Sequence, residues 1–121
     1  MSRLPLFLAS ALALSALTTD FALADADCSA LDSLHSKNSN TPAKLTFVNK
    51  TPESRTIIWI DFHGGQQQYK VLQPGKKWSI KTFLTHPWLV IDGPGNCLGI
   101  YLATPGSRTV NLVDFGSGGG E

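Results

Sequence analysis

Seven short runs of β-branched, aromatic and other apolar residues, separated by turn signals, constrain the fold of this chain most strongly. Such runs are typical of strands in an antiparallel sandwich, because a helix needs a longer segment with apolar residues three or four positions apart. Gly64-Gly65, Pro74-Gly75 and the stretch 92–96 mark turns between neighbouring runs. The sequence therefore predicts an all-β protein, a seven-stranded antiparallel β-sandwich. The expected strands are 44–49, 56–62, 66–71, 77–83, 88–91, 98–102 and 108–113.

The two ends of the chain depart from this pattern. Arg3 precedes an apolar run from Leu4 to Leu17, and Ala22-Leu23-Ala24 fits the small-x-small cleavage site of a secretory signal. The run is shorter than the ~20 residues of a transmembrane helix, and an uncleaved anchor is the second interpretation. We expect a signal peptide over 1–24, an N-terminal segment and linker over 25–43, the β-sandwich domain over 44–115 and a flexible tail over 116–121.

Both cysteines lie beyond the predicted cleavage site. An even pair in a secreted domain indicates a disulfide, here between Cys28 and Cys97, with two free thiols as the alternative. A loop of 69 residues would contribute about 4 kcal/mol in the chain-entropy treatment. Leu31 and Leu34, three positions apart, predict a short N-terminal helical turn after the signal peptide. The protein is expected to be secreted or periplasmic.

Composition and spacing argue against several classes of function. A net charge of +1 gives no basic footprint for nucleic acid or, after signal cleavage, for a membrane surface. The three histidines are far apart, and no cysteine or histidine pair has zinc-ligand spacing, so no metal and no cofactor is expected. No Gly-x-Ser-x-Gly nucleophile motif stands in a strand–turn–helix context, so we expect no enzyme. A hydrolase site built from His86, an aspartate and a serine is the weaker alternative.

The segment 59–88 holds aromatic and hydrogen-bonding side chains suited to a ring-shaped polar ligand. Trp59, Tyr69 and Trp88 offer aromatic faces on which a pyrrolidine ring can stack. Thr82 and His86 can each donate and accept hydrogen bonds. Since an unpaired buried polar group costs about 1–3 kcal/mol, a site built around a ring hydroxyl should disfavour plain proline by roughly ten- to hundredfold.

These residues resemble the β-domain of the von Hippel–Lindau tumour suppressor family. The similarity begins at Phe47-Val48-Asn49-Lys50-Thr51-Pro52, like the family's strand-ending Asn-basic-hydroxyl-Pro signature, and continues without a gap to Trp88. It covers about 45–112, with a looser register beyond Asp92. The resemblance implies a non-catalytic domain that recognises hydroxyproline in an extended peptide. The implied pocket has walls from Trp59, Tyr69 and Trp88 and hydroxyl partners in Thr82 and His86.

Three positions differ from the family pattern. Thr82 replaces a serine, Phe83 a tyrosine and Lys81 a histidine. We expect the pocket to be retained, with Phe83 lining its rim, and the peptide preference to be altered. The tumour suppressor also has a helical domain that recruits elongin C into a ubiquitin ligase, and we expect no elongin-binding helical domain here. The expected partner is a peptide or protein that contains proline or hydroxyproline.

Each proposed pocket residue also has a structural interpretation. Trp59 and Trp88 could fill the sandwich core, Tyr69 could cap a strand through its hydroxyl, and Thr82 and His86 could be surface residues on strands. Because Ile58 and Ile60 share one strand face, we expect Trp59 on the other, ligand-facing outer side. Asn49-Lys50-Thr51 is a glycosylation sequon, for which we expect a structural role in the turn after the first strand.

Two other functions remain open from the sequence. The first is a structural or protein-interaction module that kept the scaffold without hydroxyproline recognition, with Phe83 or Lys81 folded into the pocket. The second is an accessory or inhibitor domain that binds another secreted protein through a flat sheet face.

Overall fold

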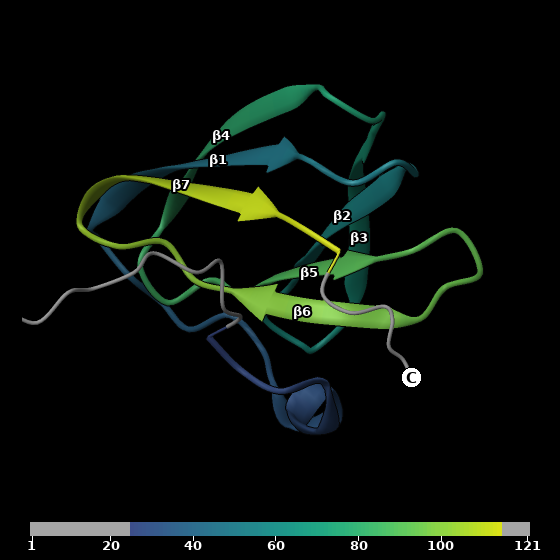
Figure 1. The fold of residues 1–121 in the computed structure, drawn as a ribbon. Helices are drawn as coiled ribbons and strands as arrows, with labels where there is room; N and C mark the ends of the chain where they lie inside the picture. The colour runs from purple at the N-terminus through teal and green to yellow at the C-terminus, as the bar shows by residue number, and fades with distance from the viewer. Residues whose placement is uncertain (1–24, 115–121) are drawn as a thin grey trace, which may run out of the picture.

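The computed structural model describes residues 25–114, so the predicted signal peptide and tail lie outside the described residues. Two sheets pack face to face (Figure 1). The strands are β1 (Pro42–Asn49), β2 (Arg55–Ile60), β3 (Gln66–Leu72), β4 (Lys77–Phe83), β5 (Trp88–Ile91), β6 (Cys97–Tyr101) and β7 (Gly106–Leu112). The three-stranded sheet has the order β4-β1-β7, and the four-stranded sheet has the order β3-β2-β5-β6. The predicted seven-stranded β-sandwich is therefore confirmed.

One strand pair differs from the purely antiparallel arrangement that the sequence predicts. β1 and β7 run parallel, with Ala43 opposite Gly106 and Asn49 opposite Leu112. The other four pairs are antiparallel. β7 follows β6 of the opposite sheet, so the chain crosses between the layers before it reaches β1. No tight hairpin joins β7 to β1, and their relative direction is therefore not dictated by a turn.

The main core lies between the two sheets. Along β1 the side chains alternate, with Leu45 and Phe47 fully buried and Lys44 exposed. This alternation is the period-two pattern of a strand with one covered face. The buried residues of this core are Leu45, Phe47, Ile57, Leu72, Trp88, Val90, Tyr101, Val110 and Leu112.

The four-stranded sheet is covered on both faces. A second cluster of Ile58, Ile60, Leu89 and Ile100 lies on the face away from the three-stranded sheet. Residues 25–37, which we call the N-terminal arm, pack against it through Ala26, Leu31 and Leu34. The arm contains the helical turn expected from the sequence, a 3-10 helix η1 (Cys28–Ser33), drawn in blue below β6 in Figure 1. Within residues 25–114, no helix is long and apolar enough to cross a membrane.

Trp59 lies on the opposite face of the sheet from the one that the sequence predicts. Trp59 packs with Ile57 against the core between the sheets, whereas Ile58 faces the arm. The predicted alternation is right, but the assignment of Trp59 to the outer side is wrong. The physical reason is that the arm covers the sheet face that carries Ile58, which leaves the inter-sheet face for Trp59.

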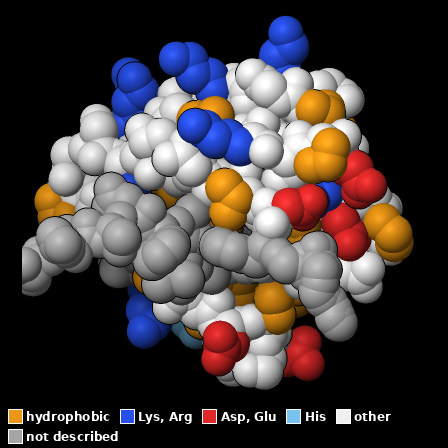
Figure 2. All heavy atoms as spheres, in the orientation of Figure 1, with side chains coloured by type: hydrophobic (Ala, Val, Ile, Leu, Met, Phe, Trp, Pro, Cys, Tyr) orange, Lys and Arg blue, Asp and Glu red, His pale blue; other side chains and the backbone are white. Residues whose placement is uncertain are grey.

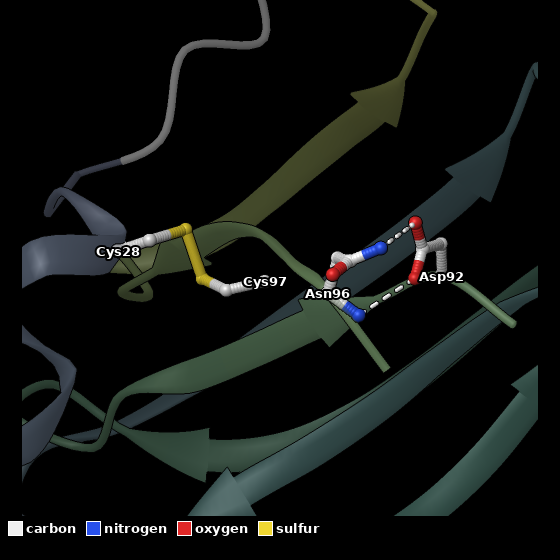
Figure 3. The surroundings of a disulfide bond; sticks show 4 residues. All are labelled: Cys28, Asp92, Asn96 and Cys97. Carbon is white, nitrogen blue, oxygen red and sulfur yellow. Dashed lines mark hydrogen bonds between the residues drawn. A yellow bond between two sulfur atoms is a disulfide. The ribbon is translucent and has the colours of Figure 1, made fainter. Parts of the chain in front are cut away.

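The predicted disulfide between Cys28 and Cys97 is present and joins the arm to the start of β6 (Figure 3). The turn before Cys97 is closed by Asp92, whose carboxylate accepts hydrogen bonds from the backbone N–H of Asn96 at 2.7 Å and from its Nδ2 at 3.1 Å. A second anchor lies at Asp25, whose carboxylate contacts Arg108 at 2.6 Å. These contacts fix the first part of the arm to the sandwich.

Asn49 has the structural role that the sequence predicts. Its fully buried side chain donates to the backbone carbonyls of Glu53 and Leu72, at 2.8 and 2.9 Å. Its Oδ1 accepts from the backbone N–H and the hydroxyl of Thr51, at 3.0 and 2.7 Å. All four hydrogen-bonding positions of the amide are thus satisfied, and the turn after β1 is closed.

Candidate functional site

An open cavity of about 310 Å³ lies between the two sheets, where the edge strands β3 and β4 approach each other. This volume is at the lower end of the ~300–1,000 Å³ typical of small-ligand sites. All six residues that the sequence analysis assigns to the pocket line the cavity, and three others join them. The lining residues are Trp59, Phe62, Tyr69, Ile80, Lys81, Thr82, Phe83, His86 and Trp88.

Three aromatic side chains wall the cavity. Trp59 on β2 and Trp88 on β5 are direct cross-strand partners, so their side chains share the inner face of the sheet. The ring of Tyr69 stands nearly perpendicular to both, with centroid distances of 6.4 Å to Trp59 and 5.0 Å to Trp88. The result is an apolar slot of suitable shape for a flat or puckered ring.

A β-bulge places Tyr69. On β3, Gln68 pairs with Ile58 and Lys70 pairs with Ile57, so Tyr69 between them has no partner on β2. An extra residue of this kind bends the strand and re-aims its side chain. Tyr69 remains 47% exposed while its ring packs on the tryptophans, which leaves much of its surface available to a ligand.

Thr82 is buried rather than a surface residue. Its hydroxyl accepts a hydrogen bond of 3.0 Å from Nε1 of Trp88. A hydroxyl has one hydrogen and two acceptor positions, so this bond leaves the Thr82 proton free to be donated. Thr82 therefore holds the Trp88 ring in place and also offers a donor beside it.

His86 is buried as well, which excludes the exposed strand-edge interpretation. Its ring lies 5.7 Å from Trp59, 5.2 Å from Phe62 and 5.4 Å from Phe83, measured between centroids. Nε2 of His86 is inaccessible and has no hydrogen-bond partner among the described residues. An unpaired buried polar atom costs about 1–3 kcal/mol, and such atoms in native proteins point to a missing partner.

The surroundings of His86 keep its ring neutral. Burial lowers the pKa of His86 below its usual 6.5, and a backbone hydrogen bond with Lys37 opposes this shift more weakly. A neutral imidazole has one donor and one acceptor nitrogen. A backbone carbonyl can only accept, and Nε2 has no partner, so Nδ1 donates to Lys37 and Nε2 is left as an acceptor for a ligand hydroxyl.

The N-terminal arm supplies a support that the sequence analysis missed. The buried Ser36 hydroxyl accepts from Nε1 of Trp59 at 2.9 Å and donates to the carbonyl of Ile60 at 2.7 Å. One residue later, the Lys37 carbonyl accepts a bond of 2.6 Å from the Thr85 hydroxyl, next to His86. No local pattern distinguishes Ser36 from the other polar residues around it, because its partners lie on a distant strand.

Phe62 and Ile80 also line the pocket and were not expected there from the sequence. Phe62 is the more exposed of the two. Its ring packs edge-on against Trp59 at 5.5 Å, and its side chain is 44% exposed. A large exposed aromatic residue beside a tryptophan is the signal that could have revealed it. Phe83 and Lys81 are exposed at the rim and leave the cavity open.

Metal chemistry has no support in the described part of the chain. Among residues 25–114, no three His, Cys, Asp or Glu side chains come together as a metal site. The only histidine of the cavity, His86, is surrounded by aromatic rings rather than by other ligands.

A protein-family comparison agrees with this geometry. The family model of the VHL beta domain matches residues 34–97, more than half of the chain. The chain belongs to the VHL β-domain family. The match includes Ser36 of the arm and every residue that lines the cavity. VHL β-domains are non-catalytic substrate-recognition domains, so the family places this chain among binding modules, with a protein or peptide as the kind of partner.

Proposed function

We propose that this protein is an exported, non-catalytic module that binds an extended peptide by enclosing a proline or 4-hydroxyproline ring. The observation that carries the proposal is the buried Nε2 of His86, which lacks a partner and belongs to a residue that lines an aromatic cavity together with the other five expected residues. Family membership supports recognition, and the Cys28–Cys97 disulfide is consistent with an oxidising, extracytoplasmic compartment.

The pocket chemistry favours a hydroxylated ring over a plain one. Trp59, Tyr69 and Trp88 would contact the apolar ring faces. The ring hydroxyl would accept from Thr82 and bond to Nε2 of His86, which satisfies both protein groups. Plain proline would bury the same groups without partners, and the affinity should fall by roughly ten- to hundredfold.

The peptide backbone has a neighbouring strand to join. β4 is at the edge of its sheet and pairs only with β1, so one side of its backbone is free for strand addition. Thr82 and Phe83 lie on this strand. A peptide along β4 would therefore pass directly over the cavity.

The competing interpretation is an interaction module with a blocked pocket. It requires Phe83 or Lys81 to fold inward, whereas both side chains are exposed and the cavity is open. This observation favours peptide recognition over the blocked scaffold.

The test is a titration of the purified protein with two matched peptides, one with proline and one with 4-hydroxyproline, followed by tryptophan fluorescence. We expect saturable binding that is at least about tenfold tighter for the hydroxylated peptide. His86→Ala should remove most of that preference, and Tyr69→Ala should weaken both peptides.

The matched control is Val71→Ala, an exposed residue on the same strand as Tyr69 that does not line the cavity. Circular dichroism of each variant checks that it is folded. No saturable response to either peptide, or a His86→Ala variant with full hydroxyproline preference, would refute the proposal.

A further inference from the structure

We infer that the bound peptide carries an acidic residue directly next to the enclosed ring, and that Lys81, assisted by Lys44, selects it. This inference rests on the proposed function and adds a specificity element to it. It follows from an unusual lysine pair on the outer face of the three-stranded sheet, at the rim of the cavity.

The two lysines face each other across neighbouring strands. Lys44 on β1 is the direct partner of Lys81 on β4, and both side chains are exposed on the same face. Like charges in directly opposed positions destabilise a sheet. The ion pairs among residues 25–114 involve Arg55 and Arg108, so neither lysine has an acidic partner there. The pair is therefore an uncompensated positive site.

The surrounding sheet face does not neutralise this charge. The outward residues of the three strands include a third lysine, Lys77, together with hydroxyl and amide side chains, and none is acidic. Every Asp and Glu of the described part lies in the arm, in a loop or after β7. Figure 2 shows basic side chains along the upper rim, where Figure 1 places β4 and β1, and acidic ones at the right and bottom.

Strand alternation predicts which residue of the peptide lies next to the two lysines. On β4, Thr82 is buried in the cavity, while its neighbours Lys81 and Phe83 are exposed and line the rim. A peptide strand paired with β4, with its ring opposite Thr82, turns both flanking residues to the outer face. One of them meets Lys81 and the other meets Phe83. The ligand should therefore have an acidic residue on one side of the ring and an apolar residue on the other.

The ring itself fits such a strand. Proline lacks a backbone N–H and is tolerated in an edge strand only where that N–H would point away from its neighbour. The backbone of the ring residue must therefore point away from β4, and the residues on either side of it form the backbone hydrogen bonds to β4. This condition does not fix the strand direction, so the acidic residue can precede or follow the ring.

The test uses three 4-hydroxyproline peptides of identical length. One has glutamine on both sides of the ring, one has glutamate before it, and one has glutamate after it. Each is titrated against the wild type, Lys81→Gln and Lys50→Gln. Lys50 is an exposed lysine in the loop after β1 and is the matched control, because it does not line the cavity.

We expect one glutamate position to bind about two- to fivefold tighter than glutamine in the wild type, the range of an exposed ion pair. High salt should remove this advantage. The ratio of glutamate to glutamine affinity should fall to about one in Lys81→Gln and stay unchanged in Lys50→Gln.

Three outcomes contradict the inference. Equal affinity for all three peptides refutes it and leaves the proposed function standing. A glutamate preference that survives in Lys81→Gln refutes the role of Lys81. If no peptide binds at all, both the inference and the proposed function are refuted.

Discussion

At His86, the unpaired Nε2 atom is the strongest indication of what the pocket binds. Its position on the loop before β5 puts it against three aromatic rings and removes it from solvent. The same burial that isolates Nε2 keeps the ring neutral at pH 7. Thr82 shows a complementary arrangement, since its bond from Trp88 leaves one proton for a ligand. Nε2 of His86 and the hydroxyl proton of Thr82 both remain available for a hydrogen bond to a ligand.

The depressed pKa of His86 makes ligand binding depend on pH. A peptide that covers the ring disfavours the imidazolium further, so the complex binds fewer protons than the free protein. We expect affinity for the 4-hydroxyproline peptide to be highest at and above the usual histidine pKa of about 6.5, and to fall as the pH drops through the lowered pKa of His86 in the free protein. Fluorescence titrations between about pH 5 and 8 measure this effect in the window of histidine titration.

The control for the pH profile is His86→Gln, which cannot titrate and should give a flat profile across the same window. The free energy of unfolding should depend on pH in the same direction. Because the pKa of His86 is lowered in the folded state, its contribution to stability is present above pH 6.5 and is lost as the pH falls. Affinity that increases on acidification would contradict the assignment of a neutral His86.

Among the elements, the N-terminal arm has the most unexpected role. It covers the outer face of the four-stranded sheet, and its end at Ser36 and Lys37 reaches the back of the pocket. Through Ser36 it holds the indole of Trp59, and through Lys37 it holds the loop that carries His86. The boundary between the expected helical turn and the expected linker, at Ser36 and Lys37, thus supports the candidate site.

Ser36→Ala tests this support. The change leaves Nε1 of Trp59 and the carbonyl of Ile60 without their present partner, which should cost about 1–3 kcal/mol of stability. It should also weaken peptide binding, because the Trp59 ring is no longer held. Urea unfolding and peptide titration of the same variant give the two quantities.

Ser33→Ala is the matched control for the arm. Ser33 is exposed, and its hydroxyl bonds only within the helical turn, to the carbonyl of Ala30. This variant should change neither stability nor affinity by much. A Ser36→Ala variant that binds peptide as well as Ser33→Ala does would exclude a positioning role for the arm.

For the molecule as a whole, we expect the disulfide to contribute to both the stability of the fold and the binding of the peptide. The bond between Cys28 and Cys97 closes a loop across 69 positions and ties the arm to the four-stranded sheet. About 4 kcal/mol from the chain-entropy treatment is large beside the ~5–15 kcal/mol of a typical domain. Because the arm also supports Trp59, losing the bond should affect the pocket before the sandwich.

We expect the double variant Cys28→Ser, Cys97→Ser to lose about 4 kcal/mol of unfolding free energy. Denaturant unfolding measures this loss, and reduction of the wild type provides an independent check without any substitution. Peptide affinity should fall under conditions in which far-ultraviolet circular dichroism still reports a folded sandwich. An unchanged unfolding midpoint in both experiments would contradict the stapling role.

The sequence was sufficient for the strands because their signals are local. The alternation in β4, the apolar run of β5 and the glycine-containing turns each depend on neighbouring residues. The structure has strands at the first two places and connections between strands at the glycines. The spacing of Trp59, Tyr69, His86 and Trp88 resembles that of a known family, and the structure brings these four residues to one cavity. Phe62 was missed because it was assigned to the strand 56–62, whereas β2 ends at Ile60. Ser36 was missed because its partners, Trp59 and Ile60, are distant in the chain.

The local alternation of residues is enough to predict which side chains share a face of a strand. Which of those faces is covered, and by what, depends on how the sheets and the arm pack together. Trp59 was expected outside, and it points inward because the arm, brought to the other face by Cys28 and Cys97, occupies the side of Ile58. The parallel pairing of β1 and β7 has the same origin, because strands far apart in the chain pair through the packing of the whole sandwich and not through a turn between them.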